Sequence, residues 1–344
     1  MRQKVYFNNY IFLLFFSLII VILGTTCGFA ENSIVLTDSD GYRVKIKLPV
    51  KRIICLSAPL NEILIALDAG NKIIGRDDWS ATSTALNMLK DIPIVASSSY
   101  RPQIESIIEL DPDIVIADTM LQDDARKKFN YFSIPTIAER TSEASNLFDV
   151  IRKLAKIVNN EKKAAELITF ISQYRGLINE RVAGLREDEK TRVYWEWRGK
   201  YKTGSSKATV QARIELAGGI NICANTVGRY PEVSSEYVIQ EDPELIIRME
   251  SPGVSKQKMK ESWKEIINRT GLENTSAVKN DRVYVMNWLV NSGLPSVVGD
   301  LYYAKLAHPE LFADIEPQTV YVDLMNKFFG ISIDDNKQLI FPEY

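Results

Sequence analysis

The chain has 344 residues, of which 46% are apolar and 25% charged, and its formal net charge is −2 at pH 7. This composition is that of a globular protein and excludes a disordered or fibrous chain. The small net charge gives no reason to expect a nucleic acid or an anionic membrane as a partner, and the length favours two domains. With one histidine and three cysteines, little material exists for a histidine- or thiolate-built metal site. We therefore expect no metal site and no cofactor.

The first thirty residues have the pattern of a secretory signal sequence. Two basic residues precede the apolar run Ile11–Leu23, and the small residues Gly28 and Ala30 follow it. The run would extend only about 20 Å as a helix, which is short for a hydrocarbon core of roughly 30 Å. We predict cleavage after Ala30. Lipidation of Cys27 and an uncleaved membrane anchor are the alternatives, and all three place the rest of the chain outside the cytoplasm.

Strand and helix patterns alternate through the first half. Two runs of alternating polarity flank Asp40 and Gly41, which predicts a β-hairpin. Short β-rich runs and segments with helical spacing of apolar residues follow. The strands are predicted at 52–57, 72–78, 92–99, 113–118 and 134–139, and the helices at 61–70 and 104–110. Such alternation implies a mainly parallel sheet with helices on its faces.

Residues 145–187 have helical periodicity and no proline, and Asn159 with Asn160 separates two predicted helices. The second of these is predicted to be a rigid connector. A second α/β series follows, with strands at 192–197, 244–249 and 282–287 and helices at 210–219, 235–241, 263–271 and 297–308. We expect an irregular acidic and aromatic tail after it. The predicted organisation is a signal sequence (1–30), an N-terminal α/β lobe (31–144), a helical connector (145–187) and a C-terminal α/β lobe with a terminal helix and tail (188–344).

Three isolated side chains have simple structural interpretations. Cys55 and Cys223 lie in apolar segments, one in each half, and are predicted to be buried thiols. A disulfide between them is the alternative. His308 precedes Pro309 and is expected at a helix end.

One helix–turn–strand pattern occurs twice. ESIIELDPDIVI begins at Glu105 and EYVIQEDPELII begins at Glu236, and the glutamate precedes the proline by the same spacing in both. The copies lie too far apart for a short tandem array, so we assign one to each of two similar domains.

In chain order, the segments 52–80, 104–118, 214–222 with 232–247, and 277–287 resemble the substrate-binding proteins of ABC importers for ferric siderophores, haem and cobalamin. The resemblance extends from about Arg52 to His308. It implies two α/β lobes joined by a stiff helix, with the ligand between them and the membrane permease as partner. It also implies that Glu105 and Glu236 each contact arginines of one permease subunit, and that Tyr100 lines the cleft. We expect a monomer with a metal chelate as ligand.

Ligands of open α/β sheets collect at loops beyond the carboxyl ends of strands. Those loops are enriched in aromatic and arginine side chains, which suit flat ligands with anionic groups. The predicted ligand-binding residues are Trp79, Tyr100, Arg101, Trp195, Trp197, Arg198, Arg229, Tyr230 and Trp288. Trp195 and Trp197 share one face of a strand, which either faces the ligand or is buried in the sheet.

Two alternatives remain. An oxyanion such as molybdate or tungstate, held by arginine and by backbone amides at a helix start, is the second ligand class. A secreted enzyme is disfavoured, because His308 is the one histidine and no glycine-rich phosphate loop follows a strand. We expect a protein that binds its ligand without chemical turnover.

Overall fold

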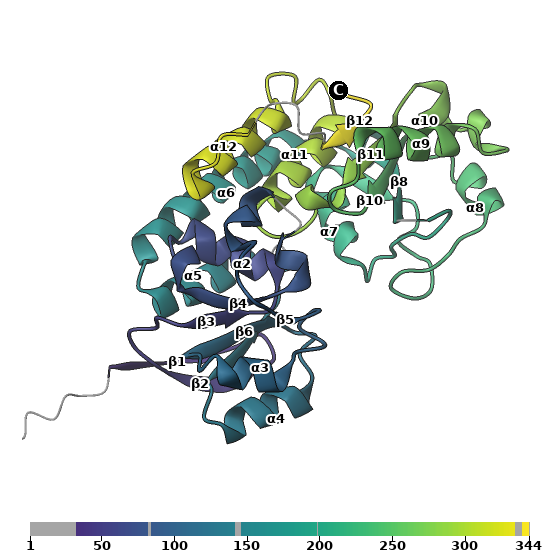
Figure 1. Ribbon diagram of the computed structural model, residues 1–344. Helices are drawn as coiled ribbons and strands as arrows, with labels where there is room; N and C mark the ends of the chain where they lie inside the picture. Colours follow the sequence, from purple (N-terminus) through teal and green to yellow (C-terminus); the bar gives the residue numbers. More distant parts are fainter. Residues whose placement is uncertain (1–31, 82–83, 142–145, 198, 334–338, 344) are drawn as a thin grey trace, which may run out of the picture.

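The computed structural model describes residues 32–81, 84–141, 146–197, 199–333 and 339–343 (Figure 1). The predicted signal sequence with Cys27, and also Arg198, lie outside the described residues. Among the described residues, no helix has the length and apolar character needed to cross a membrane.

The N-terminal lobe is built on a five-stranded parallel sheet in the order β5-β4-β3-β6-β7. The predicted hairpin lies beside it as an antiparallel pair, with Gly41 in the turn at a φ of +88°, a conformation that favours glycine. The hairpin strands are β1 (Ser33–Thr37) and β2 (Arg43–Lys47). The sheet strands are β3 (Ile53–Cys55), β4 (Ile73–Asp77), β5 (Ile94–Ala96), β6 (Ile114–Asp118) and β7 (Thr136–Glu139). The helices of this lobe are α2 (Ala58–Ala66), α3 (Ile104–Glu109) and α4 (Asp123–Tyr131).

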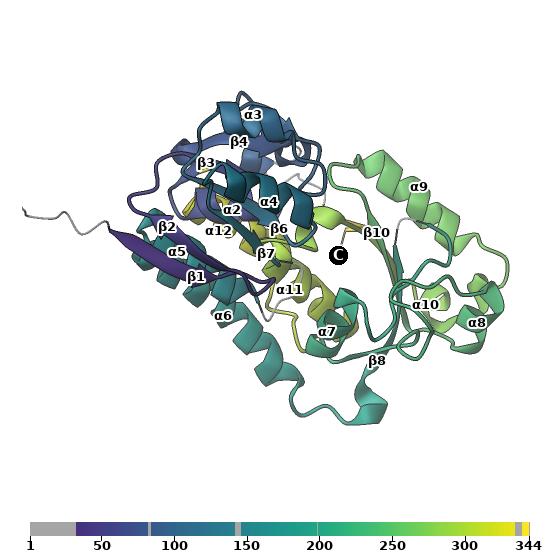
Figure 2. The same cartoon turned by 90° about the horizontal axis from the view of Figure 1, so that it is seen from below.

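Two helices follow, α5 (Leu147–Val158) and α6 (Glu161–Val182). Asn159 ends the first in the left-handed conformation, and the side chain of Asn160 accepts a hydrogen bond from the amide of Lys163 at the start of the second. The prediction that this asparagine pair separates two helices is confirmed. Figure 2 shows α6 running from the N-terminal lobe toward the second sheet.

The C-terminal lobe contains the second sheet, in the order β12-β11-β10-β8-β9, which is parallel except for β12. Its strands are β8 (Thr191–Trp197), β9 (Gly219–Asn221), β10 (Leu245–Glu250), β11 (Val283–Asn287) and β12 (Ile340–Phe341). Its helices are α7 (Thr209–Leu216), α8 (Ser235–Gln240), α9 (Lys256–Ile267), α10 (Ser276–Lys279), α11 (Ser296–Ala307) and α12 (Pro317–Phe329). The predicted fold class, two lobes with mainly parallel sheets flanked by helices, is confirmed.

The prediction of an irregular tail was wrong. Residues 317–329 form α12, which buries Val320, Leu324 and Phe328 at helical spacing, and β12 then pairs antiparallel with β11. Acidic residues on both sides of this segment, and Asp323 within it, concealed its apolar stripe.

One apolar core extends through both lobes. It includes Ile53 and Ile116 of the first sheet, Leu167 of α6, and Trp195 and Met249 of the second sheet. Helices α11 and α12 lie over the junction of the lobes (Figure 1). Helix α11 packs against α6, and α12 packs against α2. The two sheets are therefore parts of one packed body.

The isolated side chains lie as expected. Cys55 and Cys223 are both buried free thiols, and burial raises the pKa of Cys223 to about 11. His308 follows the last residue of α11, and its Nε2 lies 2.9 Å from the carbonyl oxygen of Gly218.

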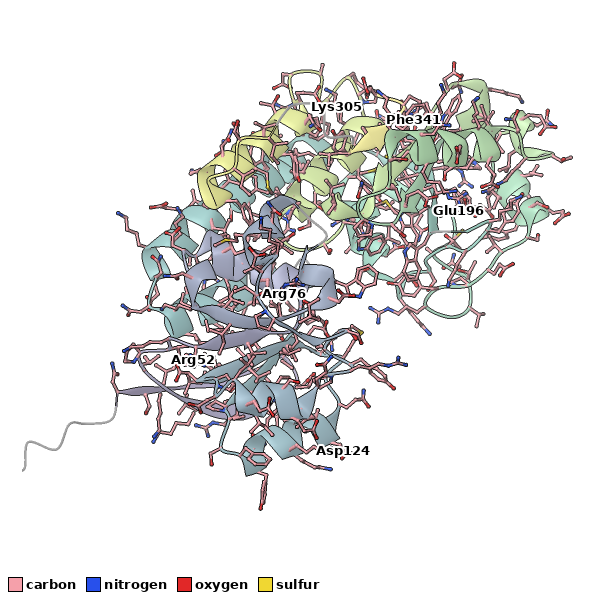
Figure 3. All side chains as sticks on the ribbon, in the orientation of Figure 1. Arg52, Arg76, Asp124, Glu196, Lys305 and Phe341 are labelled. Carbon is pink, nitrogen blue, oxygen red and sulfur yellow. The ribbon has the colours of Figure 1, made fainter. Side chains whose placement is uncertain are left out.

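An ion-pair network fixes the outer face of β8. Glu196 is fully buried and accepts hydrogen bonds from Nη1 and Nη2 of Arg269 at 2.6 and 2.8 Å, and from the amide of Tyr201 at 2.7 Å. Glu265 pairs with both Arg269 and Arg248. Although burial opposes it, these arginines lower the pKa of Glu265 to about 2. Figure 3 labels Glu196 within this lobe. The network holds the turn that follows Trp197.

We expect Glu196→Gln to lower the free energy of unfolding by about 3 kcal/mol, because it leaves Arg269 buried without its carboxylate. Glu187→Gln is the matched control, since Glu187 forms an exposed pair with Lys190 that contributes less than about 1 kcal/mol. Urea denaturation of both variants measures the difference. Equal losses in the two would contradict the assigned importance of the network.

Candidate functional site

The carboxyl ends of the parallel strands carry most of the residues predicted to bind a ligand. In the N-terminal lobe, Trp79 follows β4, and Tyr100 and Arg101 follow β5; all three are exposed. In the C-terminal lobe, Trp197 ends β8 and Trp288 follows β11. The two groups therefore come from different sheets.

Three rings gather in the C-terminal lobe and form what we term the aromatic cluster: Trp197, Tyr230 and Trp288. The ring of Trp197 has its centroid 5.1 Å from that of Tyr230 and 5.7 Å from that of Trp288. Each of the three is partly buried. The ammonium group of Lys202 lies 5.1 Å from the centroid of the Trp197 ring. A cation placed over the face of an indole is attracted to it. The cluster is a group of mutually tilted rings with a positive charge beside it.

Trp195 requires a correction. It shares the face of β8 with Trp197, as predicted, but only 1% of its surface is exposed, and it belongs to the central core. Its ring lies against Gly204, since a methyl group on that residue would lie 3.4 Å from Cζ3 of the indole. Trp195 therefore supports the site from below and offers no surface to a ligand.

A pocket of about 280 Å³ opens beside the cluster and is lined from both lobes and from α6. Its lining residues are Thr141, Leu147, Arg175, Lys207, Ala208, Thr209, Ala212, Arg213, Leu216, Arg229, Asn291, Ser292, Ser296 and Asp300. Of the residues predicted from the sequence, Arg229 is among them. The sequence analysis missed Arg175, Arg213 and Asp300, which sit inside regular helices; the one signal was an aspartate within the apolar run of α11.

Two arginines share one carboxylate at the base of the pocket. Asp300 is 2% exposed, and its two carboxylate oxygens accept hydrogen bonds from Nε of Arg175 at 3.0 Å and from Nε of Arg213 at 2.8 Å. Arg213 also donates through Nη1 to Oδ1 of Asn291. With Lys207 and Arg229, four basic side chains face one acidic side chain in the lining. The pocket is therefore electropositive.

The start of α7 adds to this positive potential. Ala208 and Thr209 line the pocket, and Ala208, at the N-cap, has no side-chain oxygen to accept hydrogen bonds from the first-turn amides. A helix start with such amides carries a partial positive charge and favours an anion. The helix start and the arginines thus both contribute positive potential to the pocket.

A buried polar cluster holds the turn that carries Trp79. Nδ2 of Asn61 donates to the carbonyl oxygen of Cys55 at 3.1 Å and to Oγ of Ser80 at 2.8 Å, and Ser80 donates in turn to Asp77. Burial raises the pKa of Asp77 to about 6. The carboxyl group of Asp77 is thus a titratable group that holds the 3-10 helix Asp78–Ala81 in place through Ser80.

Glu105 and Glu236 lie away from the pocket. Each is exposed in the first turn of a short helix, α3 in one lobe and α8 in the other. Figure 1 shows these helices on separate lobes. The amide of Glu236 itself and then the hydroxyls of Ser234 and Ser235 lower the pKa of the Glu236 carboxyl group.

The described part of the chain contains no group of three histidine, cysteine, aspartate or glutamate side chains that could hold a metal ion. The site offers an aromatic surface, a compact basic pocket and a helix start. Such an arrangement can bind an anionic group and stack a planar one.

Comparison with known proteins relates this arrangement to a family. The model of the periplasmic binding protein family matches residues 53–287. The chain is similar to the molybdate-binding protein MolA of Haemophilus influenzae, at 24% identity over 92% of this chain and 97% of that protein. It is also similar to the vitamin B12-binding protein of Vibrio parahaemolyticus, at 26% identity over 70% of this chain and 82% of that protein.

Solved structures have the same fold. The structure of MolA bound to molybdate gives a TM-score of 0.74 at 20% identity and covers 88% of this chain and 99% of that one. The structure of FepB from Veillonella parvula gives a TM-score of 0.75 at 22% identity, with 88% and 97% covered. At these identities the likeness concerns the fold alone.

The raised pKa of Asp77 predicts a pH-dependent stability. Between the ordinary value of 3.8 and about 6, the folded protein keeps a proton that the unfolded chain releases. The contribution of Asp77 to the free energy of unfolding, up to about 3 kcal/mol, is therefore fully present below pH 4 and is lost as the pH rises through 6. We expect the free energy of unfolding of wild type, relative to Asp77→Asn, to fall over this range in denaturant titrations. A constant difference would contradict the assignment.

Proposed function

The chain belongs to the periplasmic binding protein family and is the substrate-binding component of an ABC importer, and we propose that it carries an anionic metal chelate between its two lobes. An iron–siderophore, haem or corrinoid is the ligand class that we infer. The protein acts in this proposal as a monomer outside the cytoplasmic membrane, without a cofactor and without chemical turnover of its ligand.

The observation that carries the proposal is the contact between the aromatic cluster and the basic pocket. Arg229 lines the pocket, and its guanidinium lies 5.8 Å from the ring of Tyr230. The carbonyl oxygen of Arg229 accepts from the amide of Ser205 at 3.2 Å, which ties its loop to the segment before α7. One ligand can thus stack on the rings and place an anionic group in the pocket.

The size of the pocket supports this division of roles. A volume of about 280 Å³ is at the lower limit for small-molecule sites, which span roughly 300 to 1,000 Å³. A chelate is too large to enter entirely, so its planar or apolar body extends over the aromatic cluster. Trp79 and Tyr100, both about half exposed, are the proposed contacts from the N-terminal lobe.

A molybdate or tungstate ion is the second candidate. Such an ion fits inside the pocket and would accept hydrogen bonds from Arg213, Lys207 and the amides at the start of α7. The similarity to the molybdate-binding protein MolA over nearly the whole chain favours this candidate. The aromatic cluster, which a small oxyanion would not need, favours the chelate.

Delivery requires the permease. We propose that Glu105 and Glu236, one exposed carboxylate on each lobe, pair with arginines of the two permease subunits. A two-lobed protein that docks on a two-fold partner needs one similar contact in each lobe, which the repeated pattern supplies.

Titration of the purified protein with haemin, a ferric siderophore, cyanocobalamin, molybdate and tungstate identifies the ligand class. We expect one chelate to bind and quench tryptophan fluorescence. Tyr100→Ala and Tyr230→Ala should each weaken binding by about 1–2 kcal/mol, the scale of a stacked ring. Tyr131→Ala, which removes a ring that is 84% exposed on α4, is the control and should leave affinity unchanged.

Three outcomes of this titration are distinct. Tight binding of molybdate or tungstate with none of the chelates supports the second candidate. Chelate binding that is insensitive to both tyrosine changes removes those rings from the site. Binding of none of the five ligands rejects both ligand classes.

Charge reversal tests the docking role. Glu105→Arg and Glu236→Arg should each impair uptake in membrane vesicles and leave ligand affinity in solution unchanged, because like charges at a close contact cost several kcal/mol, to order of magnitude. The double reversal should lose more, since the lobes contact separate subunits. Glu109→Arg, on an exposed position of the same helix α3, is the matched control. Normal uptake by both reversed variants would show that these carboxylates serve another purpose.

A further inference from the structure

The loop between β11 and α11 makes a close contact with the other lobe at Gly293. This residue has a φ of +64°, in the left-handed region that favours glycine. A methyl group on it would overlap Oε2 of Glu62 and would lie 3.4 Å from Cβ of Pro59. Both partners lie on α2 in the N-terminal lobe, Pro59 in its first turn and Glu62 at its middle. The absence of a side chain is therefore what allows the loop to approach α2.

The same loop forms one wall of the basic pocket. The carbonyl oxygen of Gly293 accepts hydrogen bonds from the hydroxyl of Ser296 at 2.7 Å and from its amide at 3.3 Å. Asn291, two residues before Gly293, accepts from Arg213, and Asn291, Ser292 and Ser296 all line the pocket. A displacement of Gly293 would move these polar groups together.

The loop also carries a ring of the aromatic cluster. Trp288 opens the short helix Trp288–Val290, and its carbonyl oxygen accepts a hydrogen bond from the amide of Asn291 at 2.8 Å. On the opposite side the loop is confined by α11, because a methyl group on Gly299 would overlap the carbonyl oxygen of Val290. The loop is thus held between α11 behind it and α2 in front.

Glu62 has little freedom to move out of the contact. Only 8% of its surface is exposed, and α2 packs against α12 as well as against the loop. Burial and then the charge of Glu62 raise the pKa of Tyr321 on α12, which shows that the carboxylate lies near this ring. A larger residue at position 293 would therefore push the loop as well as the glutamate.

We infer that the close packing of Glu62 against Gly293 is an interlobe strut in which the combined size of the two residues sets the position of the loop 288–296, and through it that of one wall of the pocket and of the Trp288 ring. Gly293 and Glu62 are positioning residues in this inference, and neither needs to touch the ligand. The link to binding rests on the proposed function, whereas the strut itself is a property of the protein without ligand.

The experiment compares Gly293→Ala with Gly330→Ala in the full mature protein. Gly330 has the same φ of +64° and no atom near the position that a methyl group would take, so its variant has the backbone strain without the overlap. We expect faster amide hydrogen exchange over residues 288–296 in Gly293→Ala than in Gly330→Ala, measured without ligand. Adding Glu62→Ala to Gly293→Ala, which removes the overlapping carboxylate, should restore most of the protection.

Binding is then titrated with haemin and with molybdate. We expect Gly293→Ala to lower the affinity for whichever probe binds to wild type by about tenfold, because an overpacked contact displaces one wall of the pocket. The double variant should recover the affinity of wild type. Gly330→Ala should bind as wild type does. Should Gly293→Ala not fold, recovery of folded, binding protein in the double variant is the supporting result.

The outcomes separate the two proposals. Equal exchange over 288–296 in the two alanine variants, or no recovery on adding Glu62→Ala, overturns the strut whatever the ligand is. Altered exchange with recovery, but unchanged affinity for a probe that wild type binds, overturns its role in positioning the pocket. Failure of wild type to bind either probe bears on the proposed ligand alone, and the exchange measurement still decides the strut.

Discussion

The apolar core that passes from one sheet to the other is the constraint on which the rest of the molecule depends. Residues of β3, α6, β8 and β10 belong to one cluster, so the lobes cannot pack separately and still bury the same surface. Helices α11 and α12 complete the junction. Because the sheets are held this way, loops from both of them and the side of α6 meet around one small space.

The charge of that space follows from the same packing. Asp300 lies on α11 where the helix is buried on every side, and a carboxylate in such a position must be paired. Arg175 and Arg213 supply the pairing from α6 and α7. Two positive charges for one negative leave an excess of positive charge at the rim of the core. An interaction needed for packing thus also prepares the pocket for an anion.

Much of the fold could be predicted from the sequence, because short apolar runs bounded by turns and glycines have few other structures. The hairpin around Gly41 and the helix break at Asn159 are local features, determined by residues next to each other. Strand β9 and helix α12 were missed, since three residues give no periodicity and the acidic residues that flank α12 obscured its apolar stripe.

The site was predictable to a smaller degree. The rings at strand ends could be found because a parallel sheet gathers those ends, and Arg229 lies in such a loop. Arg213 and Asp300 could not, since their meeting depends on how α7 and α11 pack, which no local pattern records. The periodicity of β8 placed Trp195 and Trp197 on one face correctly, but the depth of each in the core depends on contacts distant in sequence, such as that of Gly204 with the Trp195 ring.

Strand β12 has a consequence for the order in which the molecule is completed. It lies far from β11 in the sequence, yet it covers the β11 edge of the second sheet, and α12, which precedes it, packs against α2. An emerging polypeptide therefore keeps an open sheet edge, and an incomplete junction between its lobes, until α12 and β12 have been synthesised. Contacts this distant in sequence are slow to form, and an open edge is available for pairing with other chains during that interval. A chain built in this way gains from remaining unfolded until α12 and β12 are available for packing.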